Sequence, residues 1–479
     1  MPDLAKRKRT FLGLRWEMLS TIIALAWPTM VEQLLSTAVQ YIDTAMVGVL
    51  GTTAMAAVGS TTTINWLVGS TMSAVGVGFL AFVSQSLGRG DTESAKRAAS
   101  QAVLAVLAVG TAFTVITLSL SSAVPVLMQV DEAARELASQ YFFILYLPII
   151  ARCATIIFGT VLRAAGDTKT PMRVGVIVNL ANVLLNFFFI YESREIDILS
   201  LRVFIPGAGM GVLGAAVASA VSFLAGGVLI TVALFRHPKI SPIGQSYRPD
   251  PTILKPCLKV AIPNAMQRFA TSLGYVIFAA MVNSLGEIST AAHTVANTVE
   301  SAFYIPGYGM QTAAATLAGG AYGAKDKERL TDLSRMAIFI EIILMIISGG
   351  LLFISAPFMV SLFSKDAAVI LLGTTVLKMV ALSEPFFGFS IIVEGMMQGM
   401  GKTVLPFITN VVGMWAVRIV GTFIATSFLG GDLTSAWGFM ILHNMCLFAV
   451  YLILFISGKW NPLKKSGASL SEERIEQNA

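Results

Sequence analysis

Apolar residues recur along almost the whole chain in windows long enough to cross a membrane. A membrane-spanning helix needs roughly 20 mostly apolar residues, and the chain contains about twelve such windows. They are residues 17–48, 54–86, 97–121, 134–162, 172–191, 211–235, 254–285, 290–321, 333–355, 367–398, 404–429 and 435–457. The pattern therefore predicts an all-α membrane protein with twelve transmembrane helices.

The first window is apolar but carries two carboxylates, Glu32 and Asp43. On a helix with about 100° per residue, Ser36, Gln40 and Asp43 fall within about 80° of Glu32, so they form one polar stripe. A carboxylate near the middle of a bilayer costs several kcal/mol unless it faces a cavity or a partner, and it usually serves a function. We expect Glu32 and Gln40 to contact substrate. The alternative is a pair of carboxylates satisfied by hydrogen bonds inside a helix bundle.

The composition is that of a membrane protein, and the distribution of Lys and Arg residues predicts its orientation in the membrane. Of 479 residues, 55% are hydrophobic and only 13% are charged, which is not typical of a soluble domain. Most Lys and Arg residues lie in alternate hydrophilic segments. The other segments hold Arg135, Arg194, Arg202 and Lys365. The positive-inside rule then predicts a multi-pass protein with both termini in the cytoplasm, and we expect it in the plasma (inner) membrane.

Several classes of function are disfavoured by what the sequence contains. Cys153, Cys257 and Cys446 are scattered without metal-binding spacing. The stretch 401–403 (GKT) resembles the end of a phosphate-binding loop, but Met396 stands where such a loop requires glycine. We therefore expect no enzyme activity, no cofactor, and neither nucleotide nor nucleic acid as a partner. Energy would come from a gradient of H⁺ or Na⁺.

The second half of the chain repeats the first without a gap over four spans. Gly51 corresponds to Gly286 and Pro171 to Pro406, a constant separation of 235 residues (286 − 51). We expect an N-terminal lobe at 1–235, a cytoplasmic linker at 236–252 that is rich in proline and basic residues, and a C-terminal lobe at 253–479. Six spans in each repeat predict two pseudo-symmetric lobes, as in secondary transporters with a substrate site between the halves.

Three asparagines form a second polar face, on the fifth span. Asn179, Asn182 and Asn186 recur at i, i+3 and i+7, within about 60° of one another on a helix. Near Asp43 they would supply oxygens for a hard cation such as Na⁺, or hydrogen bonds to a carboxyl that exchanges a proton. Ser219, on the sixth span, could add a hydroxyl. The alternative is that these side chains only hold helices together.

A third polar face lies on the eighth span. Glu300, Tyr304 and Tyr308 are about one helical turn apart and face the same way. A negative charge beside tyrosine rings suits an amphipathic organic cation, through charge and cation–π contact. The alternative is a Glu300–Arg268 ion pair that joins neighbouring helices.

These motifs together resemble the MATE (multidrug and toxic compound extrusion) family, and in particular its DinF-like bacterial branch. The resemblance covers residues 17–458 and depends on seven stretches: Trp27-Pro28, residues 43–48 (DTAMVG), the glycine loops at Gly88 and Gly323, residues 163–169 (RAAGDTK), residues 211–216 (GVLGAA) and residues 398–403 (QGMGKT). It implies export of amphipathic, mainly cationic compounds in exchange for H⁺ or Na⁺. It also implies that Asp43 is the coupling acid.

The same resemblance assigns roles to four further positions. It implies that Asn182, Asn186 and Ser219 are polar partners of Asp43, with a possible Na⁺ site at Asp43, Asn182 and Asn186. It implies that the first helix can bend at Pro28. We expect a monomer in the lipid bilayer. Two alternatives stay open, a lipid-linked saccharide flippase of the same superfamily and an ion channel.

Overall fold

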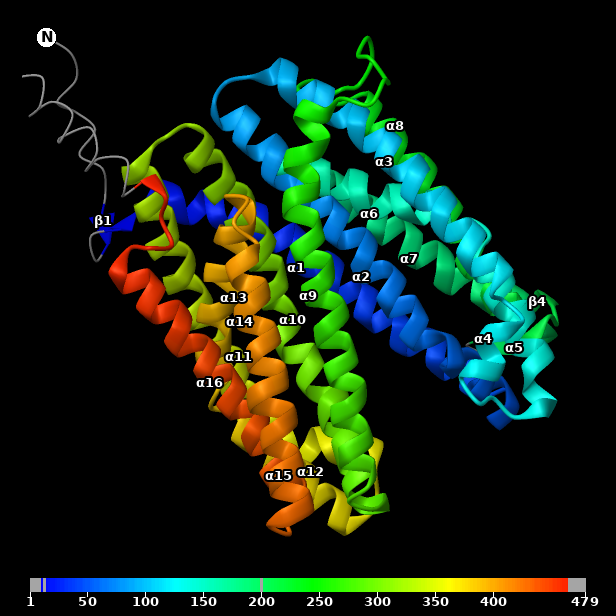
Figure 1. The fold of residues 1–479 in the computed structure, drawn as a ribbon. Coiled ribbons are helices and arrows are strands. Elements are labelled where there is room, and N and C mark those ends of the chain that lie inside the picture. The colour runs from blue at the N-terminus through cyan, green and yellow to red at the C-terminus, as the bar shows by residue number, and fades with distance from the viewer. Residues whose placement is uncertain (1–9, 12–13, 199–200, 464–479) are drawn as a thin grey trace, which may run out of the picture. The chain divides into compact units, whose positions relative to one another are not determined.

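The computed structural model describes residues 10–11, 14–198 and 201–463, and it is dominated by helices (Figure 1). The basic leader and most of the C-terminal tail lie outside the described residues. The elements are β1 (Thr10–Phe11), β2 (Leu14–Arg15), α1 (Trp16–Gly48), α2 (Thr52–Gly88), α3 (Thr92–Ser119), α4 (Ala123–Leu127), α5 (Glu132–Tyr146), α6 (Ile149–Ala164), α7 (Lys169–Phe189), β3 (Glu192–Ile198), β4 (Leu201–Ala208), α8 (Gly211–Phe235), α9 (Pro251–Asn283), α10 (Glu287–Gly323), α11 (Lys327–Phe363), α12 (Ala367–Ala381), α13 (Glu384–Gly399), α14 (Val404–Val412), the π-helix η1 (Gly413–Ile419), α15 (Val420–Phe428) and α16 (Leu433–Ser457).

Each of the predicted spans coincides with one helix or with helices that follow one another directly. Two predicted spans are bent pairs: α5 and α6 meet at 49°, and α12 and α13 meet at 52°. In the described chain, 9 helices are long and apolar enough to cross a membrane. If each bent pair is counted as one span, the number of spans is up to 11. The remaining predicted span is α10, which is long but less apolar because His293, Asn297 and Glu300 lie on it.

The turns of the two halves repeat in backbone conformation as well as in sequence. A positive φ is a conformation that glycine adopts without steric cost. Three pairs of positions separated by 235 residues (286 − 51) have it: Gly51 (107°) and Gly286 (105°), Gly90 (79°) and Lys325 (56°), and Gly166 (86°) and Gly401 (78°). The internal repeat is therefore a repeat of structure.

Contacts within the chain divide it into two compact units. Among the described residues, unit 1 contains those of the ranges 1–30, 80–91 and 256–479, and unit 2 contains those of the ranges 31–79 and 92–255. Unit 1 is packed through small residues: a Cβ added to Gly399 of α13 would lie 1.9 Å from the carbonyl oxygen of Ala315 on α10. Such close approach is typical of helices packed in membranes. The predicted lobe boundaries stay a prediction.

The strands and the contacts of the linker were outside the helical prediction. Strands β3 and β4 form an antiparallel hairpin between α7 and α8, with Arg194 paired to Ile205. The predicted linker follows α8 and is fixed to α3 within unit 2. Gln101 donates from Nε2 to the Arg248 carbonyl (2.9 Å) and accepts from the Asp250 amide (2.9 Å).

Candidate ion and substrate site

The polar faces of α1 and α7 meet inside unit 2. Asn186 donates from Nδ2 to Oδ1 of Asp43 at 2.6 Å, and Asn182 lies beside it, 3.3 Å from Asn186. One turn away, Asn179 donates to the Ser36 hydroxyl at 3.3 Å. Asn182 and Asn186 are almost fully buried, at 6% and 1% exposure. The asparagine spacing noted in the sequence thus brings Asn182 and Asn186 to Asp43.

The Asn182 amide can face Asp43 in two orientations. In one, Nδ2 donates to the Ser219 hydroxyl at 3.1 Å and Oδ1 accepts from Asn186. In the other, the amide nitrogen lies 2.9 Å from both Asp43 oxygens, and the amide oxygen accepts from Ser219 at 3.1 Å. An ionised carboxylate has only acceptors, so the second orientation suits ionised Asp43. The first suits protonated Asp43, whose O–H can donate to the amide oxygen.

Close helix packing holds this cluster in place. A Cβ added to Gly214 of α8 would lie 2.4 Å from the carbonyl oxygen of Phe189 at the end of α7. The Tyr191 hydroxyl donates to the carbonyl of Met46 on α1 at 3.2 Å. Small residues in α8 therefore let α7 approach closely enough for Ser219 to reach Asn182.

The donor atoms around Asp43 fit either coupling ion. Carboxylate, amide and hydroxyl oxygens are hard ligands that suit Na⁺. Oδ1 of Asn186 is buried and has no hydrogen-bond partner in the described part of the chain. It could therefore accept from a protonated carboxyl or contact a cation. Within the described ranges, no group of three His, Cys, Asp or Glu residues could hold a metal ion.

Glu32, on the same stripe of α1, has a different partner. Its carboxylate lies 2.6 Å from Nη2 of Arg163 on α6, and the two side chains are 19% and 14% exposed. Gly175 of α7 leaves space for the pair, because an added Cβ would lie 3.1 Å from Cγ of Glu32. Gln40 is exposed. Sequence reasoning noted Arg163 only as part of a motif and missed this ion pair.

The residues predicted on the eighth span lie on α10, in unit 1. Glu300 is 7% exposed, and the charge of Arg418 on η1 acts on it. The rings of Tyr304 and Tyr308 meet edge to face at 5.9 Å. Arg268 instead donates from Nε to Asn264 at 2.9 Å. Among the described residues no ion pair joins Glu300 to Arg268, and the charge that acts on Glu300 is that of Arg418.

Two buried carboxylates of unit 1 had not been assigned to a site. Glu341 of α11 is fully buried, and neither of its carboxylate oxygens has a hydrogen-bond partner among the described residues. It packs against Gly307 and Gly388, since a Cβ on either glycine would lie within 3.3 Å of Oε1. Glu384 of α13 is 2% exposed, and its Oε2 is also without a partner there. In the sequence they stand as isolated charges in apolar windows, so no pattern links them.

Pro28 is buried within α1, which continues through it from Trp16 to Gly48. The contact division places α1 in unit 1 up to Met30 and in unit 2 from Val31. The boundary between the two groups of contacts therefore falls within one helical turn of the proline. A proline inside a helix removes one backbone hydrogen bond, which makes this turn easier to bend.

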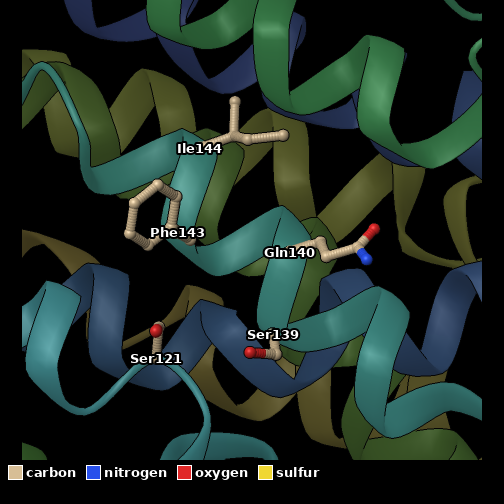
Figure 2. A pocket seen from close by; sticks show the side chains of 5 residues that line it. All are labelled: Ser121, Ser139, Gln140, Phe143 and Ile144. Atoms are coloured by element: carbon tan, nitrogen blue, oxygen red, sulfur yellow. The ribbon is translucent and has the colours of Figure 1, made fainter.

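One pocket lies apart from all the predicted site residues. Its volume is about 340 Å³, and Ser121, Ser139, Gln140, Phe143 and Ile144 line it. Figure 2 shows Ser121 on the connection after α3 and the other four side chains on α5. None of these residues carries a charge, so this pocket contributes nothing to an ionic site.

Comparison with known proteins gives a consistent result along the chain. The MatE family matches residues 28–188 and 263–424. The probable multidrug resistance protein NorM of Thermotoga maritima is 25% identical over 461 residues, covering 96% of both chains. The probable multidrug resistance protein YpnP of Bacillus subtilis is 24% identical and covers 93% of this chain and 96% of its own.

Solved structures share the fold. A crystal structure of MATE in complex with MaL6 has a TM-score of 0.85 at 23% identity, covering 94% of this chain and 97% of that one. A MOP superfamily transporter from Pyrococcus furiosus also has a TM-score of 0.85 at 23% identity, covering 93% and 97%. The predicted fold class, twelve transmembrane helices in two pseudo-symmetric six-helix lobes, is thereby confirmed.

Proposed function

Because the chain belongs to the MatE family, we propose that it is a secondary active efflux transporter for amphipathic, mainly cationic organic compounds. Transport would be antiport with H⁺ or Na⁺ across the plasma membrane, with both termini in the cytoplasm. The observation that carries the proposal is the environment of Asp43. Its hydrogen-bond partner Asn186 and its neighbour Asn182 are both neutral amides, so its charge is left for a proton, a Na⁺ ion or an organic cation.

Competition between the coupling ion and the organic compound for the charge of Asp43 would couple their movements across the membrane. When Asp43 holds a proton or Na⁺, it no longer attracts a cationic compound. When it is ionised, the Asn182 amide turns its nitrogen toward the carboxylate and the site favours a cation. Binding of ion and compound is then mutually exclusive, and two arrangements of the lobes would carry them in opposite directions. Pro28 is the position at which we expect α1 to bend.

The acidic and aromatic face of α10 would bind substrate. Glu300 supplies a negative charge with low exposure, and the rings of Tyr304 and Tyr308 offer faces for cation–π contact. On the stripe of α1, we expect Gln40 to contact substrate directly. Glu32, whose charge is matched by Arg163, would contribute less charge to the site than the sequence predicts.

A reconstituted system tests the proposal. Purified protein in liposomes is given a pH gradient or a Na⁺ gradient separately, and movement of a fluorescent organic cation against its own gradient is followed. Uphill movement that requires one of the two gradients is expected. Downhill conductance without exchange would identify a channel. Movement of a lipid-linked saccharide without either gradient would identify a flippase.

A further inference from the structure

Arg418 is a buried cation on the π-helix η1 of unit 1, and the proposed transport mechanism does not use it. Its guanidinium lies over two aromatic rings of α9. The carbon Cζ is 5.1 Å from the ring centroid of Tyr275 and 5.3 Å from that of Phe278. Both rings attract the positive charge, but neither supplies an oxygen that could accept from the N–H groups of the guanidinium.

The N–H groups of Arg418 lack acceptors. Both Nε and Nη1 are buried and have no hydrogen-bond partner among the described residues. Glu300 feels the charge of Arg418, but no ion pair joins the two side chains in that part of the protein. A guanidinium presents its N–H groups as a planar fork that matches an anion, and buried donors without an acceptor are costly. The edge of this guanidinium is therefore suited to an anion.

Two more polar side chains without partners lie along the same side of this helix. Thr422 follows Arg418 by one turn, so the two side chains are neighbours. On the other side of Arg418, a Cβ added to Gly413 would lie 2.7 Å from Nε2 of His443 on α16. Gly413 precedes Arg418 by one π-helical turn of five residues. The Thr422 hydroxyl and both ring nitrogens of His443 have no partner within the described ranges.

The backbone of η1 leaves the Thr422 hydroxyl free. In an α-helix a threonine hydroxyl can bond to the carbonyl four residues earlier, as Thr426 does to Thr422 at 2.9 Å. The carbonyls of a π-helix instead accept from residues five positions later, and Thr422 makes no such side-chain bond. Short π-helices within α-helices are frequent at functional sites. The irregular turn thus gathers unsatisfied donors in one place.

The charge and burial of these groups specify the class of ligand. The guanidinium is positive, and the hydroxyl and the imidazole can each donate a hydrogen bond, so the group suits an anion and not a metal cation. The side chains of Arg418, Thr422 and His443 are at most 5% exposed. A site enclosed between helices in this way suits a small anion such as chloride or bromide.

We propose that Arg418, Thr422 and His443 form a binding site for a small monovalent anion of the halide class. The anion accepts from Nε and Nη1 of Arg418, from the Thr422 hydroxyl and from a ring N–H of His443. The site lies within unit 1 and includes no residue of the Asp43 cluster. The inference therefore goes beyond the proposed transport function and does not depend on it.

Thermal unfolding of the purified full-length protein tests the site. Chloride or bromide replaces gluconate at constant ionic strength, and the melting temperature is followed, because a ligand that binds the native state raises it. Wild type should show a saturable rise. Thr422→Val keeps the shape of the side chain and removes the hydroxyl, so the apparent Kd for halide should rise about tenfold. In gluconate alone this variant should melt above wild type, because an unpartnered buried hydroxyl is removed.

Thr316→Val is the matched control. Thr316 is also a buried threonine of unit 1 whose hydroxyl has no partner among the described residues. It lies on α10, 16 residues after Glu300 (316 − 300), which is about 24 Å along the helix. Thr316→Val should raise the melting temperature in gluconate in the same way, and it should leave the halide response as in wild type.

Variants of the arginine and a direct location of the ion complete the test. Arg418→Gln should remove the saturable response, and Arg418→Lys should retain a weaker one, because it keeps the charge and loses the fork. Crystals soaked in bromide should give an anomalous peak beside Nε and Nη1 of Arg418.

Three results would overturn the inference. The first is a wild type without a saturable halide response. The second is a halide response in Thr422→Val equal to that of wild type, which decides the matter even if Arg418→Gln folds poorly. The third is a bromide-soaked crystal without a peak beside Arg418.

Discussion

Asp43 and Glu32 lie on the same polar stripe of α1, yet their surroundings differ. Asp43 receives a hydrogen bond from the neutral amide of Asn186 at 2.6 Å. Glu32 faces the guanidinium of Arg163 at the same distance. Amide donors satisfy a carboxylate without cancelling its charge, whereas a guanidinium cancels it. Of these two carboxylates, Asp43 is therefore the one that keeps a net charge that an exchanging ion can neutralise.

The partner of each carboxylate, and not its position on the stripe, therefore decides what that carboxylate can do. In the second repeat, the position equivalent to Glu32 is Gln267 and that of Arg163 is Gln398. Both glutamines donate to Oε1 of Glu394, at 2.8 and 3.0 Å. The equivalent positions thus hold Glu32 and its arginine in unit 2, whereas in unit 1 they hold two glutamines that donate to Glu394, a residue of α13.

The largest expected effect is the loss of transport in Asp43→Asn. The substitution keeps the size and hydrogen-bonding capacity of the side chain and removes its charge. Gradient-driven export from liposomes should fall to background, while the melting temperature of the purified protein stays near that of wild type. The contrasting variant is Glu32→Gln combined with Arg163→Gln, which removes a matched pair of charges and should retain export. Undiminished export by Asp43→Asn would remove Asp43 from the coupling role.

Replacing Asn182 or Asn186 by Leu should reduce ion-dependent substrate release about tenfold, because each variant removes an amide next to Asp43. The two asparagines and Asp43 would act at one ion site. The loss caused by each Leu variant should therefore be smaller when Asp43→Asn is already present. The measurement is ion-dependent substrate release at matched amounts of folded protein, in single and double variants.

Fully additive losses would count against a shared site. If the asparagines only join helices, each Leu change should lower the melting temperature equally in both Asp43 backgrounds. Transport would then fall only in proportion to the folded protein. Asn179→Leu is the matched control, because Asn179 bonds to Ser36 and not to Asp43.

Much of this comparison could be predicted from the sequence. The stripe of α1, the asparagine spacing and the repeat follow from helical periodicity, which the sequence shows directly. The partner of Glu32 could not be predicted, because Arg163 is distant in sequence and carries no shared spacing. The effect of the Arg418 charge on Glu300 was missed for the same reason. The β3–β4 hairpin was missed because attention to apolar windows leaves the connections unassigned.

The Glu32–Arg163 pair should matter more for stability than for transport. Arg163→Gln leaves a carboxylate without its cation in a largely buried place. Breaking a fully buried pair costs about 3–5 kcal/mol, and partial exposure here reduces the expected cost to about 2 kcal/mol of unfolding free energy. Adding Glu32→Gln should recover part of that loss, because it recreates the two glutamines of unit 1. Chemical unfolding of the purified variants measures both effects, and a double variant less stable than Arg163→Gln alone would contradict this account.

Glu300 lies between the two cases and gives the smallest expected effect. It is 7% exposed and feels the charge of Arg418, but no ion pair joins the two within the described chain. Its charge is therefore only partly compensated, more than that of Asp43 and less than that of Glu32. Glu300→Gln should weaken binding of cationic substrates by roughly 1–2 kcal/mol and leave neutral ones unchanged. Fluorescence binding with a cationic dye and a neutral dye of similar size measures the difference. If Glu300 instead serves to stabilise Arg418, both dyes should lose affinity equally and the melting temperature should fall, as we also expect when the partner of Glu32 is removed.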